Sequence, residues 1–342
     1  MNKILIVGPS WVGDMVMAQC LFTLIKTSDP HAMIDVLAPA WSLPLLQRMP
    51  EVSNAIVMPL GHGVWDLKTR YHLGKSLREK KYTQAILLPN SFKSALIPFF
   101  AKIPKRTGWR GEMRYVLLND VRILDKKRYP LMIERFMALA LPPFATLPKD
   151  YPIPALKISE DTQKAALAKY NLTNDLPILA LCPGAEFGPA KRWPLEYYAE
   201  IANEKLNAGW QVWLFGSKND IPVTEEIRTL TNGKAINLAG KTQLEEAIDL
   251  LELAGMVVSN DSGLMHIASA LQKPLIAIYG PTSTGFTPPL SQKAKTLSLS
   301  LDCQPCFERT CPLKHERCMR ELTPRMVLDA MTAFETSDKM RA

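Results

Sequence analysis

Short apolar strands alternate with helical stretches along this chain, and the alternation restricts the fold more than any other feature. Four runs near the N-terminus have the length and nearly continuous apolarity of strands buried on both faces: KILIVG (3–8), MIDVLA (33–38), NAIVM (54–58) and QAILLP (84–89). Helical stretches, such as residues 14–26 and 65–82, lie between them. This order predicts a parallel sheet covered by helices.

The alternation is interrupted once and then resumes. Residues 141–156 (LPPFATLPKDYPIPAL) contain five prolines and read as a linker. Five more strands are expected after it, at 178–184, 211–217, 235–240, 256–261 and 274–280. We therefore predict two doubly wound, Rossmann-like α/β domains, at 1–155 and 156–325, followed by a C-terminal helix and tail at 326–342. Such sheets bind ligands beyond the carboxyl ends of their strands, so we expect a site in a cleft between the domains.

The composition excludes several classes of protein. The chain has 342 residues, of which 47% are hydrophobic, enough for two cores and too many for a disordered protein. No apolar run approaches the roughly 20 residues that span a bilayer, and the first residues form a strand pattern rather than a signal peptide. We expect a cytoplasmic protein.

The net charge of +8 is concentrated in one segment. Residues 102–128 hold nine Lys and Arg against three acidic residues. This excess suits a phosphorylated substrate or an acidic membrane surface, although a simple solvated basic face would have the same composition. Only Trp109 and Tyr115 are interleaved with these charges, which is too little aromatic surface to indicate nucleic-acid binding.

The first strand runs into a glycine loop, GPSWVGDM (8–15). A dinucleotide fingerprint requires a second glycine, and Ser10 stands in its place; a P-loop sequence is also absent. What remains is Asp14 at a helix start. It can serve as an N-cap that suits the helix dipole, or as a general base beside a ligand.

In the second domain, the loop CPGAEFGPAKRWP (182–194) has the features of an anion site. Gly184 and Gly188 permit a close approach to the main chain, while Lys191 and Arg192 supply positive charge. We expect this loop to hold a diphosphate.

Two further loops follow strands of the second domain. In FGSKND (215–220), Asp220 can accept a hydrogen bond from a ribose hydroxyl or cap the next helix. In NDSGLMH (260–266), Asp261, Ser262 and Gly263 open a helix whose free N–H groups favour a phosphate. His266, in the first turn or so, can donate to a phosphate or sugar oxygen, although a histidine on an apolar helix is more often a core residue.

These loops carry a resemblance to a known family. The stretches GPSWVGDMVMAQ, LPNSFKSAL, RTGWRGEMRY, PGAEFGPAKRWP and NDSGLMH closely resemble those of bacterial ADP-heptose:lipopolysaccharide heptosyltransferases, most of all the heptosyltransferase II branch. The resemblance implies a GT-B fold, with acceptors binding mainly to the N-terminal domain and the donor, ADP-heptose, to the C-terminal one. The implied acceptor is the first heptose of the lipopolysaccharide inner core. First- or third-heptose transfer and a non-catalytic lipopolysaccharide-binding module are the alternatives.

The resemblance also implies roles for individual residues. Asp14 matches the catalytic base of a single, inverting displacement. Lys191 matches the diphosphate-binding lysine, Asp220 falls at the ribose-binding position, and Asp261, Gly263 and His266 match the donor loop. No metal or other cofactor is implied. For the phosphorylated acceptor, at the inner face of the cytoplasmic membrane, we expect contacts from the basic residues Lys93, Arg106, Arg110 and Arg114.

Four cysteines crowd into CQPCFERTCPLKHERC (303–318). Their spacing matches neither a ferredoxin run nor a common zinc finger, and a reducing cytosol disfavours disulfides. Two possibilities remain: a structural zinc ion, or a cluster of reduced and partly buried thiols. We expect the thiol cluster, formed by Cys303, Cys306, Cys311 and Cys318.

Overall fold

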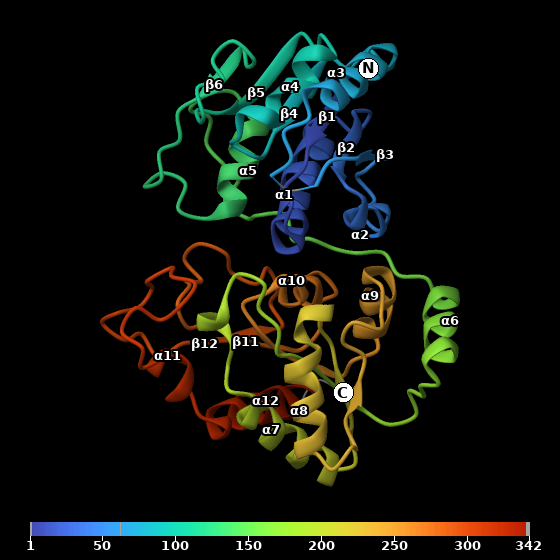
Figure 1. The fold of residues 1–342 in the computed structure, drawn as a ribbon, viewed down its shortest axis with the longest axis vertical. Coiled ribbons are helices and arrows are strands. Elements are labelled where there is room, and N and C mark those ends of the chain that lie inside the picture. The colour runs from blue at the N-terminus through green and yellow to red at the C-terminus, as the bar shows by residue number, and fades with distance from the viewer. Residues whose placement is uncertain (1, 62, 340–342) are drawn as a thin grey trace. The chain divides into compact units, whose positions relative to one another are not determined.

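A computed structural model describes residues 2–61 and 63–339 (Figure 1). The chain forms two compact units that meet in sequence between Lys157 and Ile158, and each is described below by itself. Met1 and residues 340–342, which the predicted domain bounds include, lie outside the described residues.

The first unit is built on a six-stranded parallel sheet with the strand order β3-β2-β1-β4-β5-β6. Its strands are β1 (Lys3–Val7), β2 (Met33–Pro39), β3 (Asn54–Met58), β4 (Gln84–Leu87), β5 (Lys105–Trp109) and β6 (Asp120–Arg122). Its helices are α1 (Val12–Ser28), α2 (Leu43–Gln47), α3 (Leu67–Ser76), α4 (Phe92–Phe100) and α5 (Met132–Ala140), with short 3₁₀ turns η1 (Ala40–Ser42) and η2 (Leu77–Lys80).

Alternate residues of the central strands point to opposite faces of this sheet. Leu5 and Val7 of β1, with Leu87 of β4, form one core together with Leu96 and Ile97 of α4. Helices α3 and α4 pack against each other, as do α1 and α5 (Figure 1). Helices therefore protect the central strands, which explains why these strands read as continuous apolar runs.

The second unit repeats the architecture, with the strand order β12-β11-β10-β7-β8-β9, again all parallel. Its strands are β7 (Ile178–Cys182), β8 (Gln211–Leu214), β9 (Ile236–Asn237), β10 (Met256–Asn260), β11 (Leu275–Ile278) and β12 (Ala294–Leu297). Its helices are α6 (Glu160–Tyr170), α7 (Leu195–Asn207), α8 (Ile221–Leu230), α9 (Leu244–Glu252), α10 (Gly263–Ala270), α11 (Arg317–Arg320) and α12 (Pro324–Lys339), with 3₁₀ turns η3 (Pro189–Lys191) and η4 (Lys218–Asp220).

The last helix belongs to the core of this unit. Val327, Ala330 and Met331 of α12 are buried with Tyr198 and Ile201 of α7 in one hydrophobic cluster. Helix α12 is thus packed into the core of the second unit.

The predicted fold class, two Rossmann-like units with parallel sheets, is confirmed. All nine expected strands are present. Three were missed: β5, β6 and β12. Each is short and rich in polar residues, and β6 and β12 lie at sheet edges, where one side of the strand needs no partner.

The proline-rich segment is not a free linker. The side chain of Gln19 bonds both the N–H and the carbonyl of Ala155, the hydroxyl of Tyr151 donates to Glu134, and the N–H of Lys157 donates to the carbonyl of Arg48. The segment is therefore fastened along the first unit. Among the residues the model describes, no helix combines the length and apolarity needed to cross a bilayer.

Candidate active site

Asp14 lies in the first turn of α1, and its side chain is partly exposed. The N-cap of this helix is Trp11, so the alternative that Asp14 is the N-cap is wrong. A carboxylate in the first turn is still stabilised by the helix dipole. Because α1 follows β1 directly, Asp14 stands near the carboxyl edge of the first sheet, where doubly wound folds bind their ligands.

The basic residues expected to contact an acceptor are divided between the two edges of this sheet. Lys93 lies in the first turn of α4, which follows β4, and Arg110 immediately follows β5, so both belong to the carboxyl edge with Asp14. Arg106 lies near the beginning of β5, at the opposite edge. At about 3.3 Å per residue, β5 separates Arg106 from Arg110 by roughly 13 Å.

Arg114 is only 1% exposed, and its guanidinium group binds the protein itself. It donates to the carbonyls of Pro89 and Trp109 and to the side chains of Asn90 and Ser94. Burial lowers its pKa to about 10, so it remains charged at neutral pH. Arg114 thus fixes the loops after β4 and β5, and we leave it out of the proposed acceptor surface.

In the second unit, the structure brings Lys191 and Asp261 together. The Lys191 ammonium lies 2.6 Å from Oδ2 of Asp261, and the hydroxyl of Thr282 donates to the same oxygen at 2.6 Å. Asp261 is 5% exposed. Its side chain therefore turns toward Lys191 and orients the ammonium group, an arrangement that neither loop reveals by itself.

Asn260, the last residue of β10, holds the loop at 182–194, here called the anion loop, against the sheet. Its amide donates to the carbonyl of Pro183 at 2.7 Å, and its side-chain oxygen accepts from the N–H of Trp193 and the hydroxyl of Tyr198. All these groups are buried. Both ends of the loop are thus fixed to the carboxyl edge of the second sheet.

The two glycines of this loop serve packing. A Cβ on Gly184 would lie 2.5 Å from the Asp220 carboxylate, and a Cβ on Gly188 would lie 2.5 Å from the carbonyl oxygen of Arg309. Protein groups therefore occupy the space that the sequence suggested for an anion at these two positions. The glycines are needed so that the loop can approach Asp220 and Arg309.

Asp220 forms a capping box with Ser217. Its Oδ2 accepts from both the N–H and the hydroxyl of Ser217, at 2.8 Å each, and so closes the capping box of the 3₁₀ turn η4. Asp220 is also the N-cap residue of the next helix, α8, but its side chain makes no capping bond to that helix. The other oxygen, Oδ1, lies 3.8 Å from Nη2 of Arg192. A ribose contact stays a proposal, and Oδ1 is the oxygen that could make it.

Helix α10 begins at Gly263, and Ser262 is its N-cap, with Oγ accepting from the N–H of Met265 at 3.4 Å. His266 in this helix is buried. Burial lowers its pKa to about 4; Asp261 opposes this shift and Lys191 adds to it. The imidazole is thus neutral at pH 7, and any hydrogen bond it donates to a ligand comes from the neutral ring.

This shifted pKa predicts an acid-dependent loss of stability. In the unfolded chain His266 binds a proton as the pH falls below 6.5, whereas in the folded protein it stays neutral until about pH 4. The free energy of unfolding is therefore largest above pH 6.5 and decreases as the pH falls from 6.5 to 4. Between pH 7 and 5 we expect His266 to account for about 2 kcal/mol of that loss. Urea unfolding of His266→Gln at both pH values should show a correspondingly smaller change; an identical pH dependence in both proteins would contradict the buried, neutral histidine.

Arg309 was not predicted from the sequence. Its carbonyl accepts from the N–H of Ala190 at 3.1 Å, and its guanidinium carbon lies 5.5 Å from the centre of the Phe187 ring. The Lys191 ammonium lies 4.8 Å from the same ring. No sequence spacing links residue 309 to the loop at 183–191, so only the tertiary structure could identify it.

The four cysteines of residues 303–318 surround one small cavity of about 30 Å³, which His315, Ala190 and Pro281 also line. All four are free thiols with partly exposed side chains. Within residues 2–61 and 63–339, no three His, Cys, Asp or Glu side chains are arranged to hold a metal ion. The thiol cluster remains our expectation for this segment.

Comparison with known proteins places these features in a family. Residues 70–316 match the model of glycosyltransferase family 9 (heptosyltransferase). The chain is 50% identical over 338 residues to lipopolysaccharide heptosyltransferase 2 of Salmonella typhimurium, covering 96% of this chain and 97% of the relative. It is 54% identical over 309 residues to lipooligosaccharide heptosyltransferase 2 of Haemophilus influenzae, covering 87% and 88% of the two chains.

A solved structure agrees with these sequence matches. The structure of E. coli ADP-heptose lps heptosyltransferase II superposes with a TM-score of 0.88 at 46% identity, covering 99% of this chain and 100% of the other. A family 9 glycosyl transferase from Veillonella parvula, 18% identical with a TM-score of 0.84, shares the fold. The chain belongs to glycosyltransferase family 9, the heptosyltransferase family.

Proposed function

We propose that this enzyme transfers a heptose from ADP-heptose to the first heptose of the lipopolysaccharide inner core. The observation that carries the proposal is the 50% identity, over 96% of the chain, to a relative named lipopolysaccharide heptosyltransferase 2. The Lys191–Asp261 pair and the start of α10, both at the carboxyl edge of the second sheet, support it because a nucleotide-sugar donor needs a site for its diphosphate.

The proposed reaction is a single displacement. The Asp14 carboxylate takes the proton of the acceptor hydroxyl, whose oxygen attacks the anomeric carbon of the donor while the bond from that carbon to the diphosphate oxygen breaks. ADP leaves with the bonding electrons, and the configuration at the anomeric carbon inverts. Lys191 and the free N–H groups at Gly263 stabilise the charge that develops on the diphosphate. This scheme uses no metal or other cofactor.

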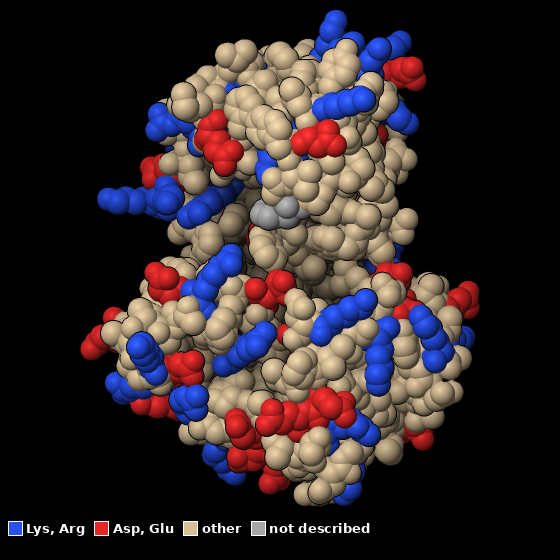
Figure 2. Space-filling view, viewed as in Figure 1, with Lys and Arg blue, Asp and Glu red and all other residues tan. Residues whose placement is uncertain are grey.

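For the acceptor, we propose that Lys93 and Arg110 contact its phosphate groups. Both lie at the same sheet edge as Asp14, whereas Arg106 does not. On the face of the molecule shown in Figure 2, basic and acidic side chains are interspersed, so the net charge of +8 does not form one continuous basic surface there. We propose that Lys93 and Arg110, as individually positioned cations, recognise the acceptor.

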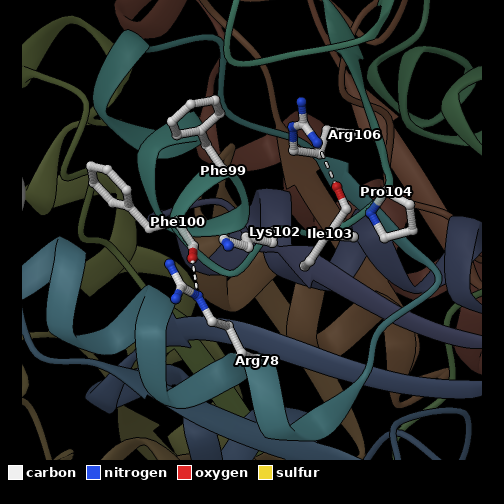
Figure 3. Close-up of a pocket in the computed structure, with 7 residues that line it drawn as sticks. All are labelled: Arg78, Phe99, Phe100, Lys102, Ile103, Pro104 and Arg106. Atoms are coloured by element: carbon white, nitrogen blue, oxygen red, sulfur yellow. Dashed lines mark hydrogen bonds between the residues drawn. The ribbon is translucent and has the colours of Figure 1, made fainter.

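We also propose that the first unit associates with an acidic membrane surface, through the pocket that contains Arg106. The pocket has a volume of about 340 Å³ and lies between η2 and the segment that runs from the end of α4 to the start of β5 (Figure 3). Arg78 is held by the carbonyl of Phe100, and the Arg106 guanidinium lies 5.7 Å from the Phe99 ring. Cations beside aromatic rings suit a phosphate head group above lipid tails; the lining residues are Arg78, Phe99, Phe100, Lys102, Ile103, Pro104 and Arg106.

Vesicle binding tests the membrane proposal. Lys102 is exposed and lies in the α4–β5 connection, so Lys102→Glu should weaken binding to phosphatidylglycerol vesicles by roughly tenfold or more. Lys293→Glu makes the same charge change at an exposed position of the second unit and serves as the control. Equal binding by both variants, or equal binding of the wild type to phosphatidylcholine, would refute a specific electrostatic site at this pocket.

The activity itself is tested by ADP release. The enzyme is mixed with ADP-heptose and one of three acceptors, which carry no heptose, one heptose or two heptoses. We expect release with the one-heptose acceptor and a new heptose on it. Preferred release with either other acceptor would indicate first- or third-heptose transfer, and no release with any of them would favour a non-catalytic binding module.

A further inference from the structure

The positive charge in the proposed donor site is already largely neutralised by the protein. Lys191 pairs with Asp261 at 2.6 Å, and Arg192 lies 3.8 Å from Asp220. Between Pro183 and Ala190 the loop has no basic, hydroxyl or amide side chain, and it contains the acidic Glu186. A diphosphate bound here would therefore meet cations whose charge is shared with carboxylates, and an additional cation would strengthen its binding.

Arg309 is placed to be that cation. Its carbonyl accepts a hydrogen bond from the N–H of Ala190 in the loop. The loop has a glycine at position 188, where it packs against the same carbonyl. Its guanidinium group and the Lys191 ammonium both lie over Phe187. The shared ring holds the two cations on the same stretch of loop.

The charge of Arg309 is not matched by a carboxylate. Its side chain is exposed, and in the part of the chain that the model describes it forms no ion pair. Glu186 and Glu308 are the acidic residues adjacent to Phe187 and Arg309 in sequence, and both are exposed to water. Arg309 thus keeps its hydrogen-bond donors available for an anionic ligand.

The cysteine-containing segment holds Arg309 in this place. Before Arg309, Gln304 donates to the carbonyl of Gly280, and the N–H of Phe307 donates to the carbonyl of Pro281. After it, Cys318 and Met319 pack against Gly280. The cavity surrounded by the four thiols is also lined by Ala190 of the anion loop. The segment is therefore anchored on both sides of Arg309 to residues 280–281, which follow β11, and it meets the anion loop at the cavity lined by Ala190.

We propose that Arg309 is a donor-binding residue that contacts the diphosphate of the nucleotide sugar, and that residues 303–318 serve to present it. This inference rests on the proposed function, since it takes the ligand of the loop to be a nucleoside diphosphate. It assigns to the segment a role, the positioning of Arg309, that requires no metal ion.

Calorimetric binding of ADP, AMP and adenosine to the full-length enzyme tests the inference. Arg309→Gln should weaken ADP binding on the order of tenfold and leave adenosine affinity within about twofold, because the lost contact is to phosphate. Arg309→Lys should recover part of the loss. Lys314→Gln, an exposed cation of the same segment, is the control and should bind all three ligands like the wild type.

The possible failures are distinguishable. If the wild type binds ADP and Arg309→Gln binds it equally well, the inference is wrong and the proposed function stands. If Arg309→Gln loses ADP, AMP and adenosine in equal proportion, Arg309 only shapes the loop and does not contact the diphosphate. If the wild type binds no ADP, both the inference and the proposed donor are wrong.

Discussion

Asp14→Asn should fold normally, bind the donor normally and turn over roughly 10²- to 10⁴-fold more slowly than the wild type. Asparagine has the size and hydrogen-bonding capacity of aspartate, but it cannot accept the proton of the acceptor hydroxyl. The proposed diphosphate contacts lie in the second unit, at Lys191 and the start of α10, so donor affinity should not change. Thermal unfolding, ADP-heptose binding and kcat should be measured on the same preparation.

The structure limits the effect of this substitution on stability. Trp11, not Asp14, is the N-cap of α1, so the capping geometry is retained. Loss of the favourable interaction with the helix dipole should cost less than about 1 kcal/mol at a partly exposed position. Asp29→Asn is a matched control: it neutralises a carboxylate at the other end of the same helix, where Asp29 accepts from Asn2. Near-normal turnover of Asp14→Asn would leave the base unassigned.

Much of the fold could be predicted because its signals are local. Both sheets are parallel and have helices packed against them, so their central strands are short and mostly apolar, and they stand out from the helical segments. Strand β5 (KRTGW) was missed because its first residues are basic and lie in the charged segment. The net charge of that segment suggested an exposed basic surface, whereas residues 105–109 form a strand of the sheet.

The charge count overstated the basic surface for the same reason. Of the nine Lys and Arg residues at 102–128, Arg114 is buried among main-chain carbonyls, and Arg122 is paired with Asp120 at 2.6 Å. Arg106 donates to the carbonyls of Ile103 and Leu117. Composition gives the charge of a side chain but not its partner. Part of the charge of a basic segment can therefore belong to side chains that stabilise the fold and are not available to a ligand.

The contacts within the proposed donor site could not be predicted, because they join loops distant in sequence. Lys191 and Asp261 are 70 positions apart and meet because β7 and β10 are neighbours in the sheet. Arg309 reaches Phe187 through a segment with no regular strand. The residue types in each loop indicated an anion site, which stays a prediction, but the pairing of cations with carboxylates required the structure.

Lys191→Ala should weaken ADP-heptose binding and transfer by about tenfold to a hundredfold, the equivalent of roughly 1.5–3 kcal/mol for a lost charge-assisted contact. The structure shows that this single variant has a second effect. Asp261, which is 5% exposed, loses the ammonium group 2.6 Å from its Oδ2. An unpaired buried carboxylate destabilises its surroundings, so a weaker donor affinity could arise from a disturbed loop.

The double variant Lys191→Met/Asp261→Asn separates the two effects. Methionine keeps an unbranched apolar side chain and asparagine keeps the size of the acid, so the pair becomes neutral without leaving a buried charge. If Lys191 binds the diphosphate, the double variant should fold as well as the wild type yet bind ADP-heptose as weakly as Lys191→Ala. If Lys191 only neutralises Asp261, the double variant should regain wild-type affinity. Calorimetric titration with ADP-heptose, together with thermal unfolding of the three proteins, decides between these outcomes. Recovered affinity would remove Lys191 from the donor contacts and leave the α10 N-terminus and Arg309 to hold the diphosphate.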